Sequence, residues 1–195
     1  FVGYHAAYNV TTGGKNTIVG RHAGNKLGAG SEDTYIGYSA GYYATGSYNT
    51  FVGSEAGKGG TTSAPFSSGE QNVAMGYYAF RNFTTGYSNT VMGTNAGDAI
   101  TSGYENAIFG QGAGSALIDG HDNVMIGQVA GGTSTSVGHA VIIGEFAGYA
   151  DLTSAADGVV LIGGGAGRNL TTGGYNLAIG YASMLRHTTG HSNIA

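Results

Sequence analysis

Residues 76–93 read GYYAFRNFTTGYSNTVMG and span the interval between two glycines that each follow a large apolar residue. The same arrangement recurs along the chain at a spacing close to 17 residues. The eleven anchor glycines are Gly3, Gly20, Gly37, Gly53, Gly76, Gly93, Gly110, Gly127, Gly144, Gly163 and Gly180. A short fixed period indicates one small structural unit that is stacked many times. This unit is too short for a helical hairpin and suits one coil of a β-solenoid.

The sequence therefore predicts an all-β fold, a parallel β-solenoid (β-roll) of about eleven coils with two short strands per coil. Residues two apart on a strand share a face, so the residues one and three before each anchor glycine are expected to point into the core. Apolar residues also recur seven positions after the glycine and predict the second strand. They are Val10, Leu27, Ala44, Phe83, Ile100, Leu117 and Leu170.

Two further columns carry structural information. Alanine follows the anchor glycine by three positions in ten of eleven units, and its small side chain lets the opposite wall of the coil approach. Asparagine precedes the glycine by four positions in most units, from Asn16 to Asn193. Asparagine tolerates turns, and identical side chains stacked coil on coil can hydrogen-bond in a ladder. We interpret the asparagine column as structural.

The column two positions before the anchor glycine is apolar throughout, although it lies opposite the predicted core face. A strand that is apolar on both faces is typically buried on both faces. We therefore expect these side chains to lie between chains in a closed, symmetric homotrimer. The predicted interface residues are Ile18, Tyr35, Phe51, Val91, Ile108, Met125, Ile142 and Leu161.

The repeat runs through residues 1–195, so we interpret the chain as a single continuous array with corner-loop insertions near 58–70 and 149–157. It begins and stops inside a unit, as expected for a piece of a longer fibre. Its 39 glycines come with one proline, unlike collagen. Charged residues make up 9%, and seven Lys and Arg against a net charge of −4 offer no basic face for nucleic acid. No cysteine and no membrane-inserting apolar run are present.

The sequence shows no convergent catalytic set, so we expect no enzyme activity, no catalytic residue, no cofactor and no metal. Glu105 and Asp122 occupy equivalent positions in neighbouring coils, as the paired carboxylates of a carbohydrate-active tailspike would, but they suit solvated corners better. His121 and His191 also share a unit position, and we interpret them as exposed turn residues.

Tyrosine is the better candidate for a functional contact. Aromatic rings on a rigid surface can stack on sugars, and the alternative is that they pack between chains. The predicted surface or glycan contacts are Tyr38, Tyr77, Tyr78 and Tyr181 in the repeat, with Phe66 and Tyr149 in the insertions. An ice-binding face is disfavoured because the threonine columns are broken, for example by Ala107 and Val124.

The unit Asn-Thr-x-aliphatic-Gly-Tyr-x-Ala, followed by Thr-Thr-Gly and then Asn, resembles the tandem repeats of bacteriophage tail fibres and related bacterial surface fibres. In many of these an endosialidase-type intramolecular chaperone domain follows the repeats. Residues 76–93 and 176–193 match best, with Thr84-Thr85-Gly86 and Thr188-Thr189-Gly190 in register. The unit is also similar to the head repeats of trimeric autotransporter adhesins. The resemblance implies an extracellular homotrimeric fibre, either a virion tail fibre that contacts a host glycan or protein, or a bacterial adhesin head or filament subunit.

Overall fold

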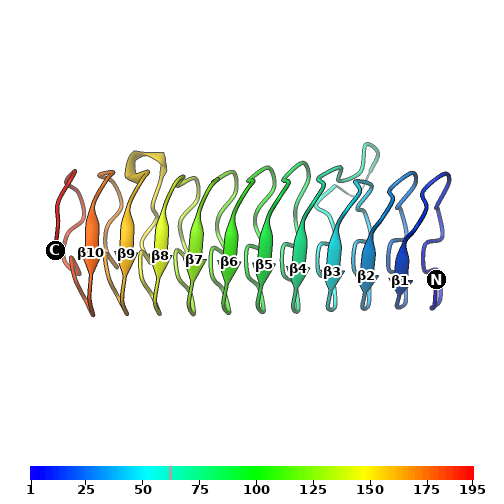
Figure 1. Cartoon of the computed structure of the whole chain (residues 1–195), viewed down its shortest axis with the longest axis horizontal. Helices are drawn as coiled ribbons and strands as arrows, with labels where there is room; N and C mark the ends of the chain where they lie inside the picture. Colours follow the sequence, from blue (N-terminus) through cyan, green and yellow to red (C-terminus); the bar gives the residue numbers. More distant parts are fainter. Residues whose placement is uncertain (62) are drawn as a thin grey trace.

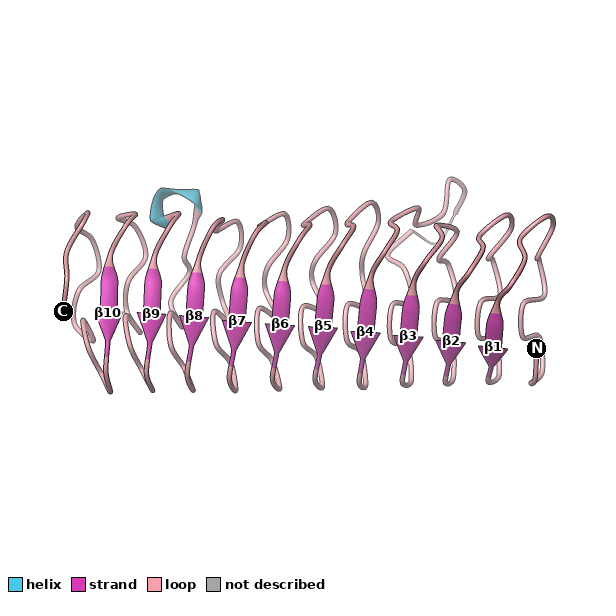
Figure 2. Ribbon diagram, in the orientation of Figure 1, coloured by secondary structure: helices cyan, strands magenta, loops and turns pink. Residues whose placement is uncertain are grey.

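The computed structural model describes residues 1–61 and 63–195. It is an all-β parallel solenoid in which successive coils stack along a rod (Figure 1). One sheet of ten strands runs in chain order, and each strand pairs in parallel with the next (Figure 2). The strands are β1 Thr17–Val19, β2 Thr34–Ile36, β3 Thr50–Val52, β4 Val73–Met75, β5 Thr90–Met92, β6 Ala107–Phe109, β7 Val124–Ile126, β8 Val141–Ile143, β9 Val160–Ile162 and β10 Leu177–Ile179. The predicted all-β parallel β-solenoid is confirmed.

Each strand ends at its anchor glycine because the backbone there takes a conformation that other residues rarely adopt. The φ angles of these glycines lie between +122° and +139°. The coils also stack glycine on glycine: a Cβ on Gly110 would lie 2.5 Å from the carbonyl oxygen of Gly127. The anchor position therefore requires glycine both for its backbone angle and for the close approach of the next coil.

The asparagine column forms the predicted ladder inside the rod. Asn106 Nδ2 donates to Asn89 Oδ1 at 2.9 Å and to the carbonyl oxygen of Gly120 at 2.8 Å. Asn106 Oδ1 in turn accepts from Asn123 Nδ2 at 2.9 Å. These side chains are buried, and from Asn49 to Asn123 each Oδ1 accepts from the amide of the following rung. The ladder explains why asparagine recurs at this position.

Asp33 takes the place of asparagine in one rung of this ladder and is almost fully buried. Its Oδ1 accepts from the backbone N–H of Asn49 at 2.8 Å. Its Oδ2 has no hydrogen-bond partner among the described residues. Burial raises the pKa of this carboxyl group to about 6, because an ionised carboxylate is poorly solvated inside the rod.

The middle residue of each strand points into the rod and forms the core, which corrects the predicted orientation of the strands. The expected interface residues Ile18, Tyr35, Phe51, Val91, Ile108, Met125, Ile142 and Leu161 are all buried within the single chain. Tyr35 and Phe51 stack there with ring centroids 5.1 Å apart. The residues one and three before the anchor glycine point outward instead. A three-residue strand can place only its middle side chain inside the narrow coil, because successive side chains alternate between faces.

The wall opposite the sheet consists mainly of turns, with isolated parallel bridges at Val10 and Ala44, so the predicted second strand does not form among the described residues. In one coil, the N–H of Ala96 bonds to the carbonyl oxygen of Gly93 and that of Ile100 to the carbonyl oxygen of Gly97. Gly97 has a φ of +50°, which is left-handed and incompatible with an extended strand. Successive coils still bond to each other, as when the N–H of Gly97 donates to Ala113 at 2.9 Å. The alanine column and the apolar column at plus seven are buried in the core as expected, for example Ala96 and Ile100.

Both long units keep their strands in register. Thr50 of β3 pairs with Val73 of β4, and Val141 of β8 pairs with Val160 of β9. The additional residues lie along the edge from which the chain enters the strands, where Figure 1 shows two projections from the otherwise regular rod. The second projection contains the short helix η1, Ser154–Ala156. Thr62, which belongs to the insertion near 58–70, lies outside the described residues.

Candidate functional site

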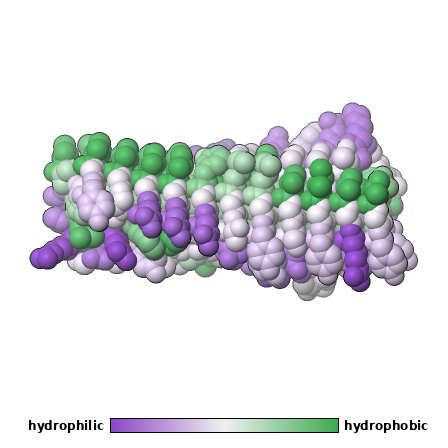
Figure 3. Space-filling view, turned by 90° about the horizontal axis from the view of Figure 1, so that it is seen from below, coloured by the Kyte–Doolittle hydropathy of each residue, from purple (hydrophilic) through white to green (hydrophobic). Residues whose placement is uncertain are grey.

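The outer face of the sheet carries an uninterrupted row of apolar side chains, which we call the outer stripe. It consists of the residue before each anchor glycine from β1 to β10. These are Val19, Ile36, Val52, Met75, Met92, Phe109, Ile126, Ile143, Ile162 and Ile179. All ten are exposed or half-buried, and Val19, Ile36, Met75 and Ile126 each expose more than a third of their surface. Figure 3 shows the row running along the length of the rod.

The strand residues next to the outer stripe are uncharged. The first residue of each strand lies on the same face and is threonine, valine, alanine or leucine, as at Thr90 and Val124. Monomeric proteins rarely expose long contiguous apolar patches, and those that they do expose are often interaction sites. A surface of this kind favours contact with another macromolecule.

Three of the predicted contact tyrosines lie beside this stripe, because they directly follow anchor glycines. The exposed fractions are 48% for Tyr38 and Tyr77 and 90% for Tyr181. Tyr78 is half-buried, and its ring stacks on Tyr77 with centroids 3.9 Å apart. Of the six predicted contacts, Tyr77 and Tyr78 form a joined aromatic surface, whereas the other four belong to different coils.

Phe66 and Tyr149, the predicted contacts in the two insertions, pack against nearby side chains of the rod. Phe66 is half-buried with its ring 5.9 Å from that of Tyr43. Tyr149 is half-buried against Phe146 and lies 5.7 Å from the Arg168 guanidinium carbon. Both aromatic side chains therefore help to anchor their loops to the rod, and part of each ring remains accessible.

A group of charged residues next to Tyr78 was not predicted from the sequence. Glu55 Oε2 lies 2.8 Å from Arg81 Nε and 3.0 Å from Lys58 Nζ, and the Arg81 guanidinium carbon lies 4.3 Å from the Tyr78 ring centroid. Burial alone would raise the pKa of Glu55, but the hydrogen bonds from Lys58 and Arg81 outweigh it and leave that pKa below its usual value. A hollow of about 170 Å³ adjoins this group and is lined by Tyr43, Lys58, Gly59, Gly60, Arg81 and Asn82.

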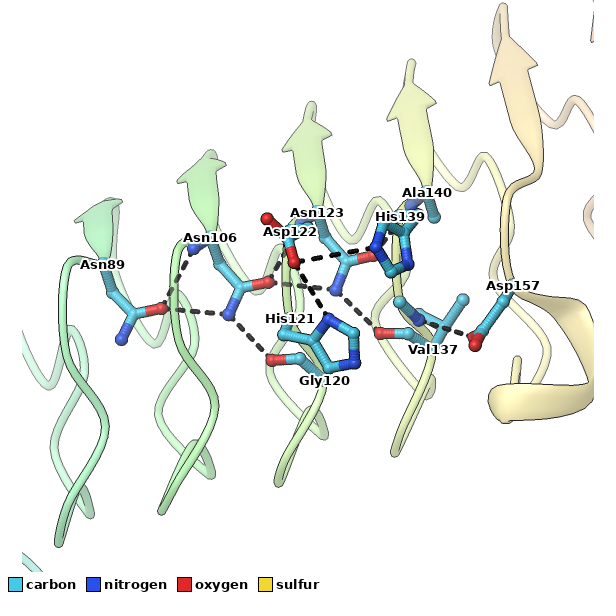
Figure 4. Close-up of polar contacts among 11 residues, drawn as sticks. Asn89, Asn106, Gly120, His121, Asp122, Asn123, Val137, His139, Ala140 and Asp157 are labelled. Atoms are coloured by element: carbon cyan, nitrogen blue, oxygen red, sulfur yellow. Dashed lines mark hydrogen bonds and ion pairs between the residues drawn. The ribbon is translucent and has the colours of Figure 1, made fainter.

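A second unpredicted cluster joins two coils at the corner that leads into β7 and β8. His121 Nδ1 lies 3.0 Å from Asp122 Oδ2, and His139 Nε2 lies 3.8 Å from the same oxygen (Figure 4). Asp122 and His139 each precede an anchor glycine by five positions, in consecutive units. The repeat alignment therefore contained the signal that brings these residues together.

Comparison of the chain with protein-family models, with curated proteins and with solved structures gives no significant match. In the part of the chain that the structure describes, no helix is both long and apolar enough to cross a bilayer. The functional interpretation of the parallel β-solenoid therefore rests on its own surface, which is compatible with a structural, fibre-like role.

Proposed function

We propose that this chain is a structural segment of an extracellular homotrimeric fibre, in which copies associate along the outer stripe. The single observation that carries the proposal is the outer stripe itself, which is apolar in all ten strands. An apolar surface of this length favours burial, at roughly 25 cal/mol per Å² removed from water. A tail-fibre shaft, an adhesin head and a filament subunit are all compatible with this assembly.

The periodicity of the stripe favours a copy of the same chain as its partner. Neighbouring strands lie about 4.8 Å apart, so the side chains repeat at that distance along a rod of roughly 50 Å. Another parallel solenoid presents the same repeat and can interdigitate with it over the whole length. Closed symmetry then covers the stripe in every copy.

The introduction of positive charges into the apolar outer stripe tests this assembly. The double variant Phe109→Lys/Ile126→Lys places two cations in the outer stripe. The control variant Thr85→Lys/Ser102→Lys places the same charges on exposed side chains at equivalent Thr/Ser-Gly corner positions of consecutive units, away from the strands. Light scattering after size exclusion should give three chain masses for the wild type and the control, and one for the stripe variant, with unchanged circular dichroism.

A monomeric wild-type chain would contradict the proposal, and so would a stripe variant that keeps the wild-type mass. A dimeric wild type together with a monomeric stripe variant would support the outer stripe as the interface and contradict the threefold arrangement.

An adhesive role is the second candidate, favoured by the joined rings of Tyr77 and Tyr78 and the Arg81 guanidinium above Tyr78. Aromatic faces stack on the apolar faces of sugar rings, and guanidinium groups donate hydrogen bonds to hydroxyl or carboxylate oxygens. Binding to an oligosaccharide array should be weakened by Tyr77→Ala and retained by Tyr8→Ala, which removes an exposed tyrosine elsewhere. Equal loss in both variants, or no binding by the wild type, would contradict this role.

A further inference from the structure

Three side chains with metal-binding atoms converge where two coils meet. One ligand atom each from His121, Asp122 and His139 lies within 4.8 Å of the other two. Asp122 provides the central oxygen, and the two imidazoles approach it from their own coils (Figure 4). We infer that these residues bind one divalent late-transition metal ion, such as Zn²⁺, and that the ion joins the coil of β7 to the coil of β8.

The spacing of the three atoms is close to that of an occupied tetrahedral site. With ligands at about 2.0–2.1 Å from zinc, neighbouring ligand atoms lie about 3.3 Å apart. The corresponding distances here are 3.0 Å from His121 Nδ1 to Asp122 Oδ2 and 3.8 Å from His139 Nε2 to the same oxygen. The His139 side chain is 64% exposed, so it can rotate toward the ion without displacing packed atoms.

The ring of His121 is held in place by its surroundings. It stacks on Tyr104 with centroids 4.9 Å apart and planes 6° apart, and it meets the ring of His139 edge-on at 5.0 Å. Gly138 leaves the space that this ring occupies, because a Cβ there would lie 3.0 Å from its Cε1 atom. The backbone N–H of His139 also donates to the carbonyl oxygen of His121 at 3.0 Å. The stacking of the coils therefore holds the backbones of the two histidines side by side.

The types of donor atom select the class of metal. Two imidazole nitrogens and one carboxylate oxygen suit Zn²⁺, Co²⁺, Ni²⁺ and Cu²⁺, whereas Ca²⁺ and Mg²⁺ prefer oxygen ligands throughout. Three protein ligands leave a fourth tetrahedral position for water.

His191 provides a matched comparison. It occupies the position in its unit that His121 occupies in its own. There, however, the ring nitrogen Nδ1 accepts a hydrogen bond from the backbone N–H of Gly174 at 3.1 Å. Substitution of His191 removes one of the chain's six histidines without touching the inferred site.

Calorimetric titration of the tag-free wild-type chain with ZnCl₂ tests the inference, with Co²⁺ absorption as a second readout. We expect one ion per chain. His121→Phe keeps an aromatic ring on Tyr104, while Asp122→Asn and His139→Asn keep side chains that tolerate the left-handed backbone at those positions. Each should weaken binding by about tenfold or more, since even the loss of an outer-shell partner costs 10- to 100-fold.

His191→Ala should bind as the wild type does, and Gly138→Ala should weaken binding although all three ligands remain. Circular dichroism confirms that each variant is folded. The inference is overturned if the wild type takes up no zinc, or if the double variant His121→Phe/His139→Asn binds as tightly as the wild type. Because all three ligands belong to one chain, this result is independent of whether the chains form a trimer.

Discussion

Ile142 and Ile143 are consecutive residues of β8 and point to opposite sides of the sheet. Ile142 is fully buried in the core, whereas Ile143 is only half-buried in the outer stripe. The two side chains are chemically identical, so a comparison of their contributions to stability shows which face of the sheet is the core of the chain.

Truncation of these two isoleucines should have unequal effects on stability. Ile142→Ala should lower the free energy of unfolding by about 2–5 kcal/mol, because it removes core contacts and leaves a cavity. Ile143→Ala should cost about 1 kcal/mol or less, because its side chain is already partly in water. Urea unfolding in the Phe109→Lys/Ile126→Lys background makes this comparison without a contribution from association. Equal losses would contradict the observed orientation of the strand.

Removal of one rung should weaken the asparagine ladder more than removal of an exposed amide. Asn106→Ala leaves the Gly120 carbonyl oxygen and the backbone N–H of Asn123 without a partner among the described residues, and it removes one of the two bonds made by Asn89 Oδ1 and by Asn123 Nδ2. Buried unpaired polar groups cost about 1–3 kcal/mol each, so we expect a loss of about 2–4 kcal/mol. The exposed Asn169 donates to the carbonyl oxygen of Leu185, and Asn169→Ala should cost less than about 1 kcal/mol. Thermal unfolding followed by circular dichroism measures both, and a similar shift in the two variants would show that the ladder contributes little.

Asp33→Asn should stabilise the rod in a pH-dependent manner. The pKa of Asp33 is raised to about 6 in the folded chain, above its value in the unfolded chain. The folded state therefore binds more protons between about pH 4 and 6, and the free energy of unfolding falls as the pH rises through this window. Asparagine has no such titration and also supplies the N–H donor of the other rungs. The variant should gain about 1–3 kcal/mol at pH 7 and much less at pH 4.

Melting temperatures of both chains from pH 4 to 8 check this prediction. The other carboxyl groups are the same in both chains, so they drop out of the difference. A constant difference across this range would show that folding does not raise the pKa of Asp33.

Substitution of an anchor glycine should disrupt the stacking of coils. At Gly110 a side chain would meet the Gly127 carbonyl oxygen in a backbone conformation that alanine rarely adopts. Gly110→Ala should therefore lower the melting temperature strongly or prevent folding. At Gly14, by contrast, an added Cβ meets no atom of the described residues within 4 Å. Gly14→Ala should be neutral or stabilising by up to about 1 kcal/mol. Equal melting temperatures for the two variants would contradict the steric role of the anchor.

The period, the parallel solenoid, the anchor glycines and the asparagine ladder could be predicted because each repeats in nearly every unit. The core face could not be chosen from alternation alone, since both faces of the strands are apolar. Composition contained the missing signal. The column that contains Tyr35 and Phe51 has no serine or threonine, whereas threonines such as Thr34 and Thr50 occupy the outward face. The second strand was over-predicted because apolar spacing does not show that Gly97 and its equivalents adopt left-handed angles.

The cluster of His121, Asp122 and His139 was missed for a different reason. Its residues occupy two adjacent positions of the repeat and come from consecutive coils, so no spacing along the sequence matches a familiar metal motif. Once the units are aligned on their anchor glycines, Asp122 and His139 become lateral neighbours. In a solenoid, side chains one period apart are as close as side chains on adjacent strands. Functional clusters in such chains are therefore best sought by comparing residues that are one repeat apart.

The asparagine ladder gives the rod a dipole along its axis. From Asn49 to Asn123, each Oδ1 accepts from the Nδ2 of the following rung, so the amide dipoles align head to tail. Their positive ends face β3 and their negative ends face β7, and neighbouring rungs polarise one another. Two rods lying side by side in the same direction place like poles together, whereas antiparallel rods place opposite poles together. A bundle of parallel copies must therefore draw its cohesion from contacts other than these dipoles.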